Sequence, residues 1–349
     1  MQIFYIGYPG PCGGANTECL DTLRLWRDAG WRVDVIPTWG KPDPESRRLV
    51  DALGCTTHVI DVKDLPDVPG LRGGIAVSMC NSGLLNTALR FKELGVRIVW
   101  LNCMTFISPI EQLAINRDGP FAAYVFQSHY QRSQLQPWYA TKNVRTDSMR
   151  VIRGAFDAMG WDYSPRPHSP CEPFVVGRIS RAAPDKFARD TWAIYDRINY
   201  RPLRAEVLGW SDEVEAKVGK PPVWAAVRAQ GSHPVRSMLR RLHAVVHVTG
   251  GSRENWPRVG LEAAAAGVPC VVERAFGWPE MIRHGVTGFL GDDEYEIAHW
   301  AGVLARDESR RLEIAANARV ALTRDLAEPS GLTAQWAELF SWVDSYGRA

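Results

Sequence analysis

Short runs of apolar residues alternate along the chain with longer segments whose apolar positions recur at helical spacing. The runs are QIFYIG, WRVDVIP, GIAVSMC, VRIVWL and AAYVFQS in the first half, then PFVVGRIS, RAEVLGW, HAVVHVT and VPCVVE in the second. Apolar runs of this length, bounded by turn residues, indicate buried strands. Their alternation with helices predicts parallel sheets covered by helices, so the expected fold class is α/β.

The first strand-to-strand connection shows the signals most clearly. Residues 15–29 carry Leu20, Leu23 and Trp26 at helical spacing, and Gly30 follows as a helix stop. Because a strand precedes this segment and another follows it, the chain opens with one crossover unit of a parallel sheet.

The alternating pattern fails in the middle of the chain, where WDYSPRPHSPCEP contains four prolines. Proline sustains neither a helix interior nor an inner strand, so we expect a linker over residues 157–172. This divides the 349 residues into two α/β domains, 1–156 and 173–332, which fits the usual size of domains. A cleft between the two is the expected ligand site.

The C-terminal segment AQWAELFSWVDSY is expected to form a helix over residues 333–347. Four apolar side chains fall on one face of it: Trp336, Leu339, Phe340 and Val343. Such a helix could lie on a membrane surface, but its two charged residues are both acidic. Anionic lipid attracts basic helices, so packing against the protein, on the first domain, is favoured.

Composition narrows the class of protein. With 46% hydrophobic residues, 23% charged residues and a net charge of +2, the chain is typical of a soluble globular protein, and net charge favours neither nucleic acid nor membrane. The seven cysteines are dispersed and lack metal-ligand spacing, which indicates reduced thiols. No basic leader precedes the first apolar run and no run reaches the ~18 apolar residues of a membrane span, so we expect a cytoplasmic protein without stable membrane insertion.

The stretch SRENWPRVGLEAAAAGVP, residues 252–269, places two glutamates around the start of a helix. Glu254 belongs to the loop after a strand and Glu262 to the helix, with Pro257 in its first turn and Gly267 at its end. On one continuous helix the two would lie ~12 Å apart, too far to share one small group. Because a helix N-terminus at the carboxyl end of a parallel strand attracts phosphate, the glutamates could hold two sugars that flank a diphosphate.

This spacing, within GGSRENWPRVGLEAAAAGVPCVVERAFGWPEMIRHGVTGFL, resembles the donor site of glycosyltransferase family four, and the resemblance covers residues 173–290. It implies the GT-B fold, in which two Rossmann-like domains face each other across a cleft. It also implies retaining, metal-independent transfer of a sugar from a UDP- or GDP-sugar donor, with the donor on the second domain and the acceptor on the first. No further cofactor is implied.

The resemblance assigns roles residue by residue. Glu254 would contact hydroxyls of the donor sugar, and Glu262 the ribose of the nucleotide. In GRISRAAPDK, Arg178 and Lys186 fall where the family neutralises the leaving diphosphate, although a lone arginine or lysine is more often a solvated surface charge. The remaining donor-binding positions implied are Asn255, Trp256, Arg258 and Gly277, the last with Glu280 in a second phosphate-side loop.

The glycine-rich loop GYPGPCGGANTE has two interpretations. Its glycines lack the Gly-x-Gly-x-x-Gly spacing of a dinucleotide site, which argues against NAD. In the resembling family, Gly13 and Gly14 would let the backbone approach the donor phosphate or the acceptor. Alternatively they form only a tight turn into the first helix.

No general base can be assigned. Many relatives carry a histidine near the reacting carbon, but none lies between His58 and His129 here, and His129 itself fits a capping or surface position. Asn102, at a strand end, is a possible substitute or an ordinary turn residue. In retaining enzymes of this fold the departing phosphate is a proposed acceptor for the proton. Asp292 and Asp293 fit a helix cap better than a metal site, so no metal is expected.

The acceptor is the least determined part. Basic residues interleave with aromatic residues in HYQRSQLQPWYATKNVRTDSMRVIR, and residues 216–252 hold six cations and no acid: Lys217, Lys220, Arg228, Arg236, Arg240 and Arg241. Such patches could follow the backbone of DNA with hydroxymethylated bases, as in phage-type DNA, which is the alternative acceptor. Because the overall charge is nearly balanced, a solvated face that attracts the nucleotide sugar is favoured over nucleic acid. A saccharide or small hydroxyl compound is the first choice. A non-catalytic nucleotide-sugar-binding module and an epimerase are the other classes.

Overall fold

The computed structural model describes residues 1–10 and 13–346, which form two compact units. The first unit contains residues 1–156 and the C-terminal segment from Glu328 on, which includes the last helix. The second unit contains Asp157–Ala327. Pro11 and Cys12 of the glycine-rich loop, and position 347 of the expected terminal helix, lie outside the described residues.

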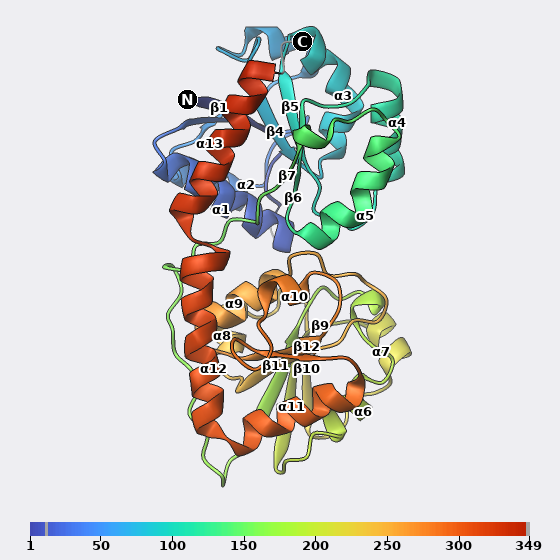
Figure 1. Cartoon of the computed structure of the whole chain (residues 1–349), viewed down its shortest axis with the longest axis vertical. Helices are drawn as coiled ribbons and strands as arrows, with labels where there is room; N and C mark the ends of the chain where they lie inside the picture. The colour runs from blue at the N-terminus through green and yellow to red at the C-terminus, as the bar shows by residue number, and fades with distance from the viewer. Residues whose placement is uncertain (11–12, 347–349) are drawn as a thin grey trace. The chain divides into compact units, whose positions relative to one another are not determined.

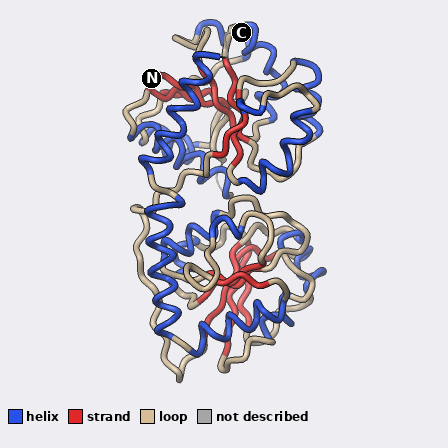
Figure 2. The backbone as a smooth tube through the Cα atoms, viewed as in Figure 1, coloured by secondary structure: helices blue, strands red, loops and turns tan. Residues whose placement is uncertain are grey.

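The first unit is built on a seven-stranded parallel sheet in the order β3-β2-β1-β4-β5-β6-β7 (Figures 1 and 2). The strands are β1 Gln2–Ile6, β2 Arg32–Ile36, β3 Thr56–Thr57, β4 Ile75–Met79, β5 Arg97–Leu101, β6 Ala123–Phe126 and β7 Met149–Val151. The helices are α1 Gly14–Asp28, α2 Pro44–Ala52, α3 Ser82–Glu93, α4 Pro109–Asp118, α5 His129–Ala140 and α13 Pro329–Tyr346, with 3₁₀ turns at Val62–Asp67 and Thr146–Ser148.

The second unit repeats the plan with a six-stranded parallel sheet in the order β10-β9-β8-β11-β12-β13. Its strands are β8 Phe174–Ile179, β9 Leu203–Trp210, β10 Ala225–Ala229, β11 Ala244–His247, β12 Cys270–Glu273 and β13 Phe289–Gly291. Its helices are α6 Thr191–Asp196, α7 Asp212–Val218, α8 Val235–Leu239, α9 Arg258–Ala266, α10 Trp278–Met281, α11 Glu294–Arg306 and α12 Glu308–Ala321, with a 3₁₀ turn at Pro184–Lys186 and a π-helical turn at Leu322–Leu326. The α/β prediction is therefore confirmed.

In each unit the first strand lies inside the sheet, and the later strands are added on both sides of it. β1 pairs with β2 on one side and β4 on the other, and β8 pairs with β9 and β11 in the same way. The loops that follow such neighbouring strands diverge to opposite faces of the sheet and leave a crevice at the carboxyl ends. In the second unit, that crevice lies beside the loops after β8 and β11.

The C-terminal helix α13 packs on the first unit. Its apolar face, Trp336, Leu339, Phe340 and Val343, is buried in one cluster with residues of α1, β1 and β2. The rings of Trp26 and Trp336 meet edge to face with centroids 5.1 Å apart. The helix begins at Pro329, earlier than the expected residue 333, because Pro329 suits a first helical turn. No helix in the described part of the chain is long and apolar enough to cross a membrane.

The proline-rich segment expected as a linker, 157–172, is part of the second unit. The Ser164 amide donates to Ala266 O (3.1 Å), and the His168 amide donates to a carboxylate oxygen of Glu308 (2.8 Å). The segment forms neither helix nor strand, as expected from its prolines, and these two amides bond to other parts of the second unit. These contacts place the segment on the second unit as an extended strap.

Candidate donor site

Arg178 comes from the carboxyl half of β8 and is 1% exposed. Its Nη1 donates to Val248 O, in the loop after β11 (2.7 Å), and the guanidinium lies over the ring of Phe187 (4.4 Å to its centroid). Nε and Nη2 are buried and find no partner in the described residues. Burial lowers the pKa of Arg178. A buried guanidinium with unused donors is costly unless an anion completes it.

Lys186 and Glu254 reach the same place from different loops. Lys186 ends the 3₁₀ turn after β8, and Glu254 lies in the loop between β11 and α9. Lys186 Nζ is 2.8 Å from Glu254 Oε1, and the two side chains are only 14% and 12% exposed. Two residues 68 positions apart in the sequence thus form one largely buried ion pair, and neither is a solvated surface charge.

His247, the last residue of β11, is a third member that sequence reasoning missed. Its Nε2 lies 3.5 Å from the same Oε1 of Glu254, and its ring packs edge to face on Trp278. Burial lowers the pKa of His247 to about 4, so the ring is neutral at pH 7. Burial works against ionisation of Glu254, but the contact with His247 and the charge of Lys186 overcome it and lower the pKa to about 2. The carboxylate is therefore ionised at every pH near neutrality.

The loops that carry Lys186 and Glu254 are held together by hydrogen bonds to their backbone groups. Lys217 Nζ donates to Pro184 O and to Gly250 O, both at 2.8 Å. The Gly250 amide donates to Asp185 O (3.0 Å), and a Cβ at Gly250 would lie 1.7 Å from Phe187 O. Lys217, which the sequence placed in a basic patch, therefore holds Lys186 and Glu254 in register. Nothing in the sequence distinguishes Lys217 from the other cations of that patch, because its role depends on contacts made only in the folded chain.

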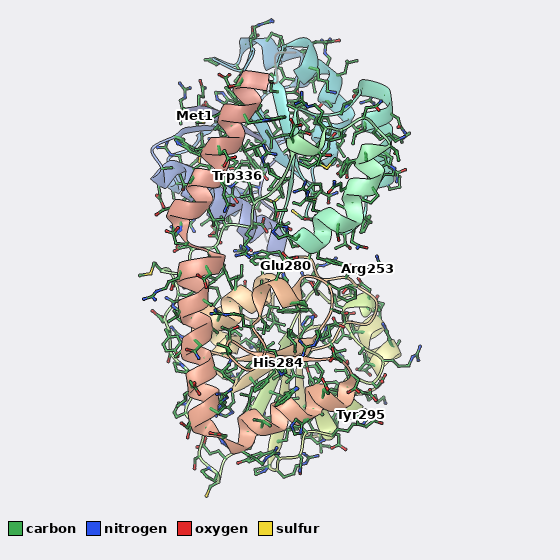
Figure 3. All side chains as sticks on the ribbon, viewed as in Figure 1. Met1, Arg253, Glu280, His284, Tyr295 and Trp336 are labelled. Atoms are coloured by element: carbon green, nitrogen blue, oxygen red, sulfur yellow. The ribbon has the colours of Figure 1, made fainter. Side chains whose placement is uncertain are left out.

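The loop of Glu254 is also held from the next strand. The Gly277 amide donates to Glu254 O (2.9 Å), and a Cβ at Gly277 would lie 1.5 Å from Asn255 O. Glu273, at the end of β12, accepts a hydrogen bond from Thr249 Oγ1 (2.7 Å), and burial raises its pKa. Arg253, beside Glu254, and Glu280 in α10 lie at the same end of the second unit in Figure 3.

The remaining predicted donor residues follow along the same segment. Asn255 and Trp256 are buried in the loop, Arg258 is the first residue of α9, and Glu262 lies half-buried on that helix. The sequence predicts Pro257 in the first turn of the helix, but the helix begins at Arg258 and Pro257 is its N-cap residue. Gly267 ends the helix in a left-handed conformation (φ 85°). Glu254 and Glu262 are thus divided between loop and helix, as the sequence indicates.

The acceptor-side predictions fall in the first unit. Gly13 (φ 112°) caps α1 and Gly14 begins it, at the carboxyl end of β1. Asn102 is buried, and its Nδ2 donates to Glu111 Oε2 (3.2 Å) while its Oδ1 accepts from the Met104 amide (2.7 Å). These bonds favour the turn interpretation of Asn102. Burial raises the pKa of Glu111 to about 7.

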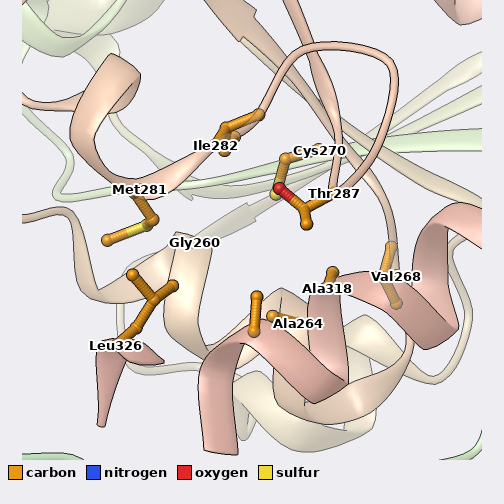
Figure 4. A pocket seen from close by; sticks show the side chains of 10 residues that line it. Gly260, Ala264, Val268, Cys270, Met281, Ile282, Thr287, Ala318 and Leu326 are labelled. Carbon is orange, nitrogen blue, oxygen red and sulfur yellow. The ribbon is translucent and has the colours of Figure 1, made fainter. Parts of the chain in front are cut away.

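The second unit contains a small apolar cavity, about 20 Å³ in volume, between α9 and α12 (Figure 4). Its lining includes Gly260, Ala264, Cys270 and Ala318. The space is that of one water molecule and has almost no polar lining, so it cannot hold a sugar nucleotide. Within residues 1–10 and 13–346, no group of three or more acidic, histidine or cysteine side chains is placed to hold a metal ion.

Comparison of the chain with solved structures gives similar folds over its whole length. Alr3699/HepE of Anabaena, solved in complex with UDP-glucose, has a TM-score of 0.74 at 19% identity, covering 98% of this chain and 99% of that one. TarM of S. aureus, solved as a mutant with fondaparinux, alpha-GlcNAc-glycerol and UDP, has a TM-score of 0.77 at 10% identity, covering 97% and 99%. These likenesses establish the GT-B fold, as predicted.

A family model matches the sequence of the second unit. Residues 172–320 match the model of the glycosyl transferases group 1. The N-acetyl-alpha-D-glucosaminyl L-malate synthase of Bacillus anthracis is 41% identical over 69 residues, which span 19% of this chain and 18% of that protein. The donor-side resemblance read from the sequence therefore lies within the matched region.

Proposed function

We propose that the protein is a retaining glycosyltransferase of the family-four type, which moves a sugar from a nucleotide-sugar donor to a hydroxyl group of a saccharide or small molecule. The observation that carries the proposal is the convergence of Arg178, Lys186 and Glu254 at the point where the second sheet reverses its strand order. Cations and a carboxylate at that position suit a diphosphate and a sugar, respectively. The family match of the second unit supports the same activity.

In the proposed reaction the bond between the anomeric carbon and the donor phosphate breaks, and the acceptor oxygen bonds to that carbon on the same face. Negative charge develops on the departing diphosphate, which Arg178 and Lys186 stabilise more strongly in the transition state than in the ground state. The acceptor proton passes to an oxygen of the departing diphosphate. Glu254 is not the proton acceptor, because its pKa of about 2 makes it a very weak base.

Glu254 instead holds the donor sugar. The side-chain contacts of Glu254 with Lys186 and His247 are both made by Oε1. This arrangement fixes the side chain and directs Oε2 to accept hydrogen bonds from sugar hydroxyls. Glu262 holds the ribose from α9, with Asn255, Trp256, Arg258 and Gly277 shaping the site between them. The first unit binds the acceptor, with the Gly13–Gly14 turn beside it.

We take a UDP-sugar as the first donor to test, because UDP is present in the complexes of both structural neighbours described above. A panel of UDP- and GDP-sugars is incubated with oligosaccharides, with small alcohols and with DNA that contains hydroxymethylated pyrimidines, and the products are identified by mass spectrometry. Added mass on a saccharide or small alcohol supports the proposal. Added mass on DNA alone assigns the alternative acceptor, and donor conversion without acceptor indicates an epimerase.

We further propose that transfer needs no metal and takes place in the cytoplasm. Arg178 and Lys186 already supply the positive charge that a divalent ion contributes in metal-dependent transferases. Turnover in the presence of excess EDTA is therefore expected to equal turnover with added Mg²⁺ or Mn²⁺. A loss of activity in EDTA that either metal restores would contradict this.

A further inference from the structure

The second unit contains a second pocket, which is polar and about 280 Å³ in volume. Its lining includes Arg166, Arg204, Arg240 and Arg241, and one acidic residue, Glu206. Four guanidinium groups around a single carboxylate give this lining a formal charge of +3, in a chain whose total is +2. The excess is concentrated in one concave place, which favours an anionic ligand.

The pocket is separate from the candidate donor site. Val175, Arg204 and Glu206 of its lining lie at the amino ends of β8 and β9, whereas Arg178 and Lys186 belong to the carboxyl end of β8. Val175 and Arg178 are three positions apart on β8, about 10 Å at 3.3 Å per residue, and residues at that spacing point to opposite faces of a sheet. One diphosphate cannot contact both places, so the arginine pocket requires a ligand of its own.

The carboxylates near the pocket do not neutralise it. Glu206, whose side chain is only 3% exposed, contacts Arg241 at 2.7 Å and Arg228 at 3.3 Å. Arg204 lies 3.9 Å from the same carboxylate and remains about half exposed. Because Glu206 already carries two closer guanidinium partners, the third adds uncompensated positive charge to the mouth of the pocket.

The carboxylate partners of the two outer arginines are exposed. Arg240 pairs with Asp162, whose carboxylate is strongly exposed. Arg166 lies 3.9 Å from the exposed Glu172, and its Nη1 also donates to Arg241 O (2.5 Å). Exposed pairs of this kind contribute about 1 kcal/mol or less. A ligand with several phosphate oxygens can therefore replace the carboxylate partners of these arginines with only a small loss of interaction free energy.

We propose that this pocket binds a small compound carrying a diphosphate or two closely spaced phosphate groups. Guanidinium forks form paired, charge-assisted hydrogen bonds with phosphate oxygens, and several forks around one cavity match two phosphates. The volume suits a small phosphorylated molecule rather than a polymer. A nucleic acid strand would instead need a continuous basic track with stacking aromatics, and none of the lining residues named for this pocket is aromatic.

The test is calorimetric titration of the full chain with inorganic pyrophosphate, with and without saturating UDP. The variant Arg204→Gln/Arg240→Gln removes two guanidinium groups and leaves the two closest partners of Glu206, Arg241 and Arg228, in place. The matched control is Arg310→Gln, which removes an exposed, ion-paired arginine of α12. We expect the double variant to weaken one pyrophosphate-binding event about tenfold or more, and the control to leave it unchanged. Pyrophosphate binding at this pocket that persists in saturating UDP indicates a ligand without a base.

Parallel titrations with UDP and with ADP identify the source of the diphosphate. Binding of both at the arginine pocket indicates a nucleoside diphosphate, and binding of pyrophosphate alone indicates a compound without a base. Unchanged pyrophosphate affinity in the folded double variant overturns the proposal. So does an oligonucleotide that binds through these arginines when pyrophosphate does not. The outcome is independent of glycosyl transfer, because no turnover is measured.

Discussion

At the scale of single residues, the candidate site depends on charges that are buried and shared. Lys186 and His247 both approach one oxygen of Glu254, and Arg178 is buried with unused donors beside them. Such an arrangement contributes little to stability, because desolvation offsets the attraction between the charges. These buried charges are better explained as a binding site in which a ligand supplies the missing hydrogen-bond and charge partners.

Replacing Glu254 by glutamine should lower kcat/KM for transfer by about 10²-fold or more. The amide keeps the size of the side chain but removes the charge that Lys186 pairs with and the second strong acceptor for sugar hydroxyls. The measurement is steady-state kinetics with the best donor found. The control, Glu313→Gln, removes a carboxylate that pairs with an exposed arginine on α12, and it should leave turnover unchanged. Near-normal turnover in the Glu254 variant would remove the proposed role.

The stability of the second unit should fall as the pH is lowered from about 6.5 toward 4. His247 has a pKa of about 4 in the folded chain and His243 of about 3, both because burial opposes the charged form. In the unfolded chain these rings take up protons near pH 6.5, so the unfolded state binds more protons within this range. Each ring can remove up to about 3 kcal/mol of stability over the window.

Urea unfolding between pH 7 and 4.5 measures this slope. His247→Asn should flatten it by about one proton, whereas His299→Asn, which changes an exposed residue of α11, should not. An equal slope in the wild-type protein and in the His247 variant would show that this ring does not carry the effect.

At the scale of elements, the long inner strands and the glutamate-bearing helix were predictable and the sheet edges were not. Every apolar run named from the sequence forms a strand, because an inner strand is covered on both faces. β3, β7, β10 and β13 were missed because they lie at the sheet edges, where burial leaves little pattern. β3, β7 and β13 are also only two or three residues long, whereas β10 has five residues that are at most partly buried. His247 and Lys217 were missed because their roles depend on a neighbouring loop that is distant in sequence.

Gly277→Ala should disturb the loop of Glu254 without removing any functional group. The added Cβ would meet Asn255 O at 1.5 Å, so the backbone of the loop must move. We expect a loss of donor affinity of about tenfold or more, and a stability loss of about 1–3 kcal/mol. Donor binding by calorimetry and urea unfolding measure the two effects.

The matched variant is Gly40→Ala in the first unit, where nothing lies within 4 Å of the new Cβ. Its donor affinity should equal that of the wild-type protein. If Gly277→Ala also bound donor normally, the close contact between this glycine and the loop would have no part in placing Glu254.

At the scale of the whole molecule, the chain passes between its two units twice, near residue 156 and near residue 327. The second passage returns the chain to the first unit, where α13 closes the core beside α1. The units nevertheless have separate cores and separate sheets. Stability and donor binding should therefore respond to different substitutions.

Trp336→Ala tests this separation. Trp336 is buried against Trp26 and Phe340, and truncating such a side chain costs about 3–5 kcal/mol. Hydrogen exchange read by mass spectrometry should show faster exchange in α1, β1 and β2, while β8, β11 and β12 keep their protection. Donor affinity should stay within about twofold of the wild-type value, because no group that holds the donor belongs to the first core. Equal loss of protection in both sheets would mean that the two units unfold as one, and donor binding would then depend on α13 as well.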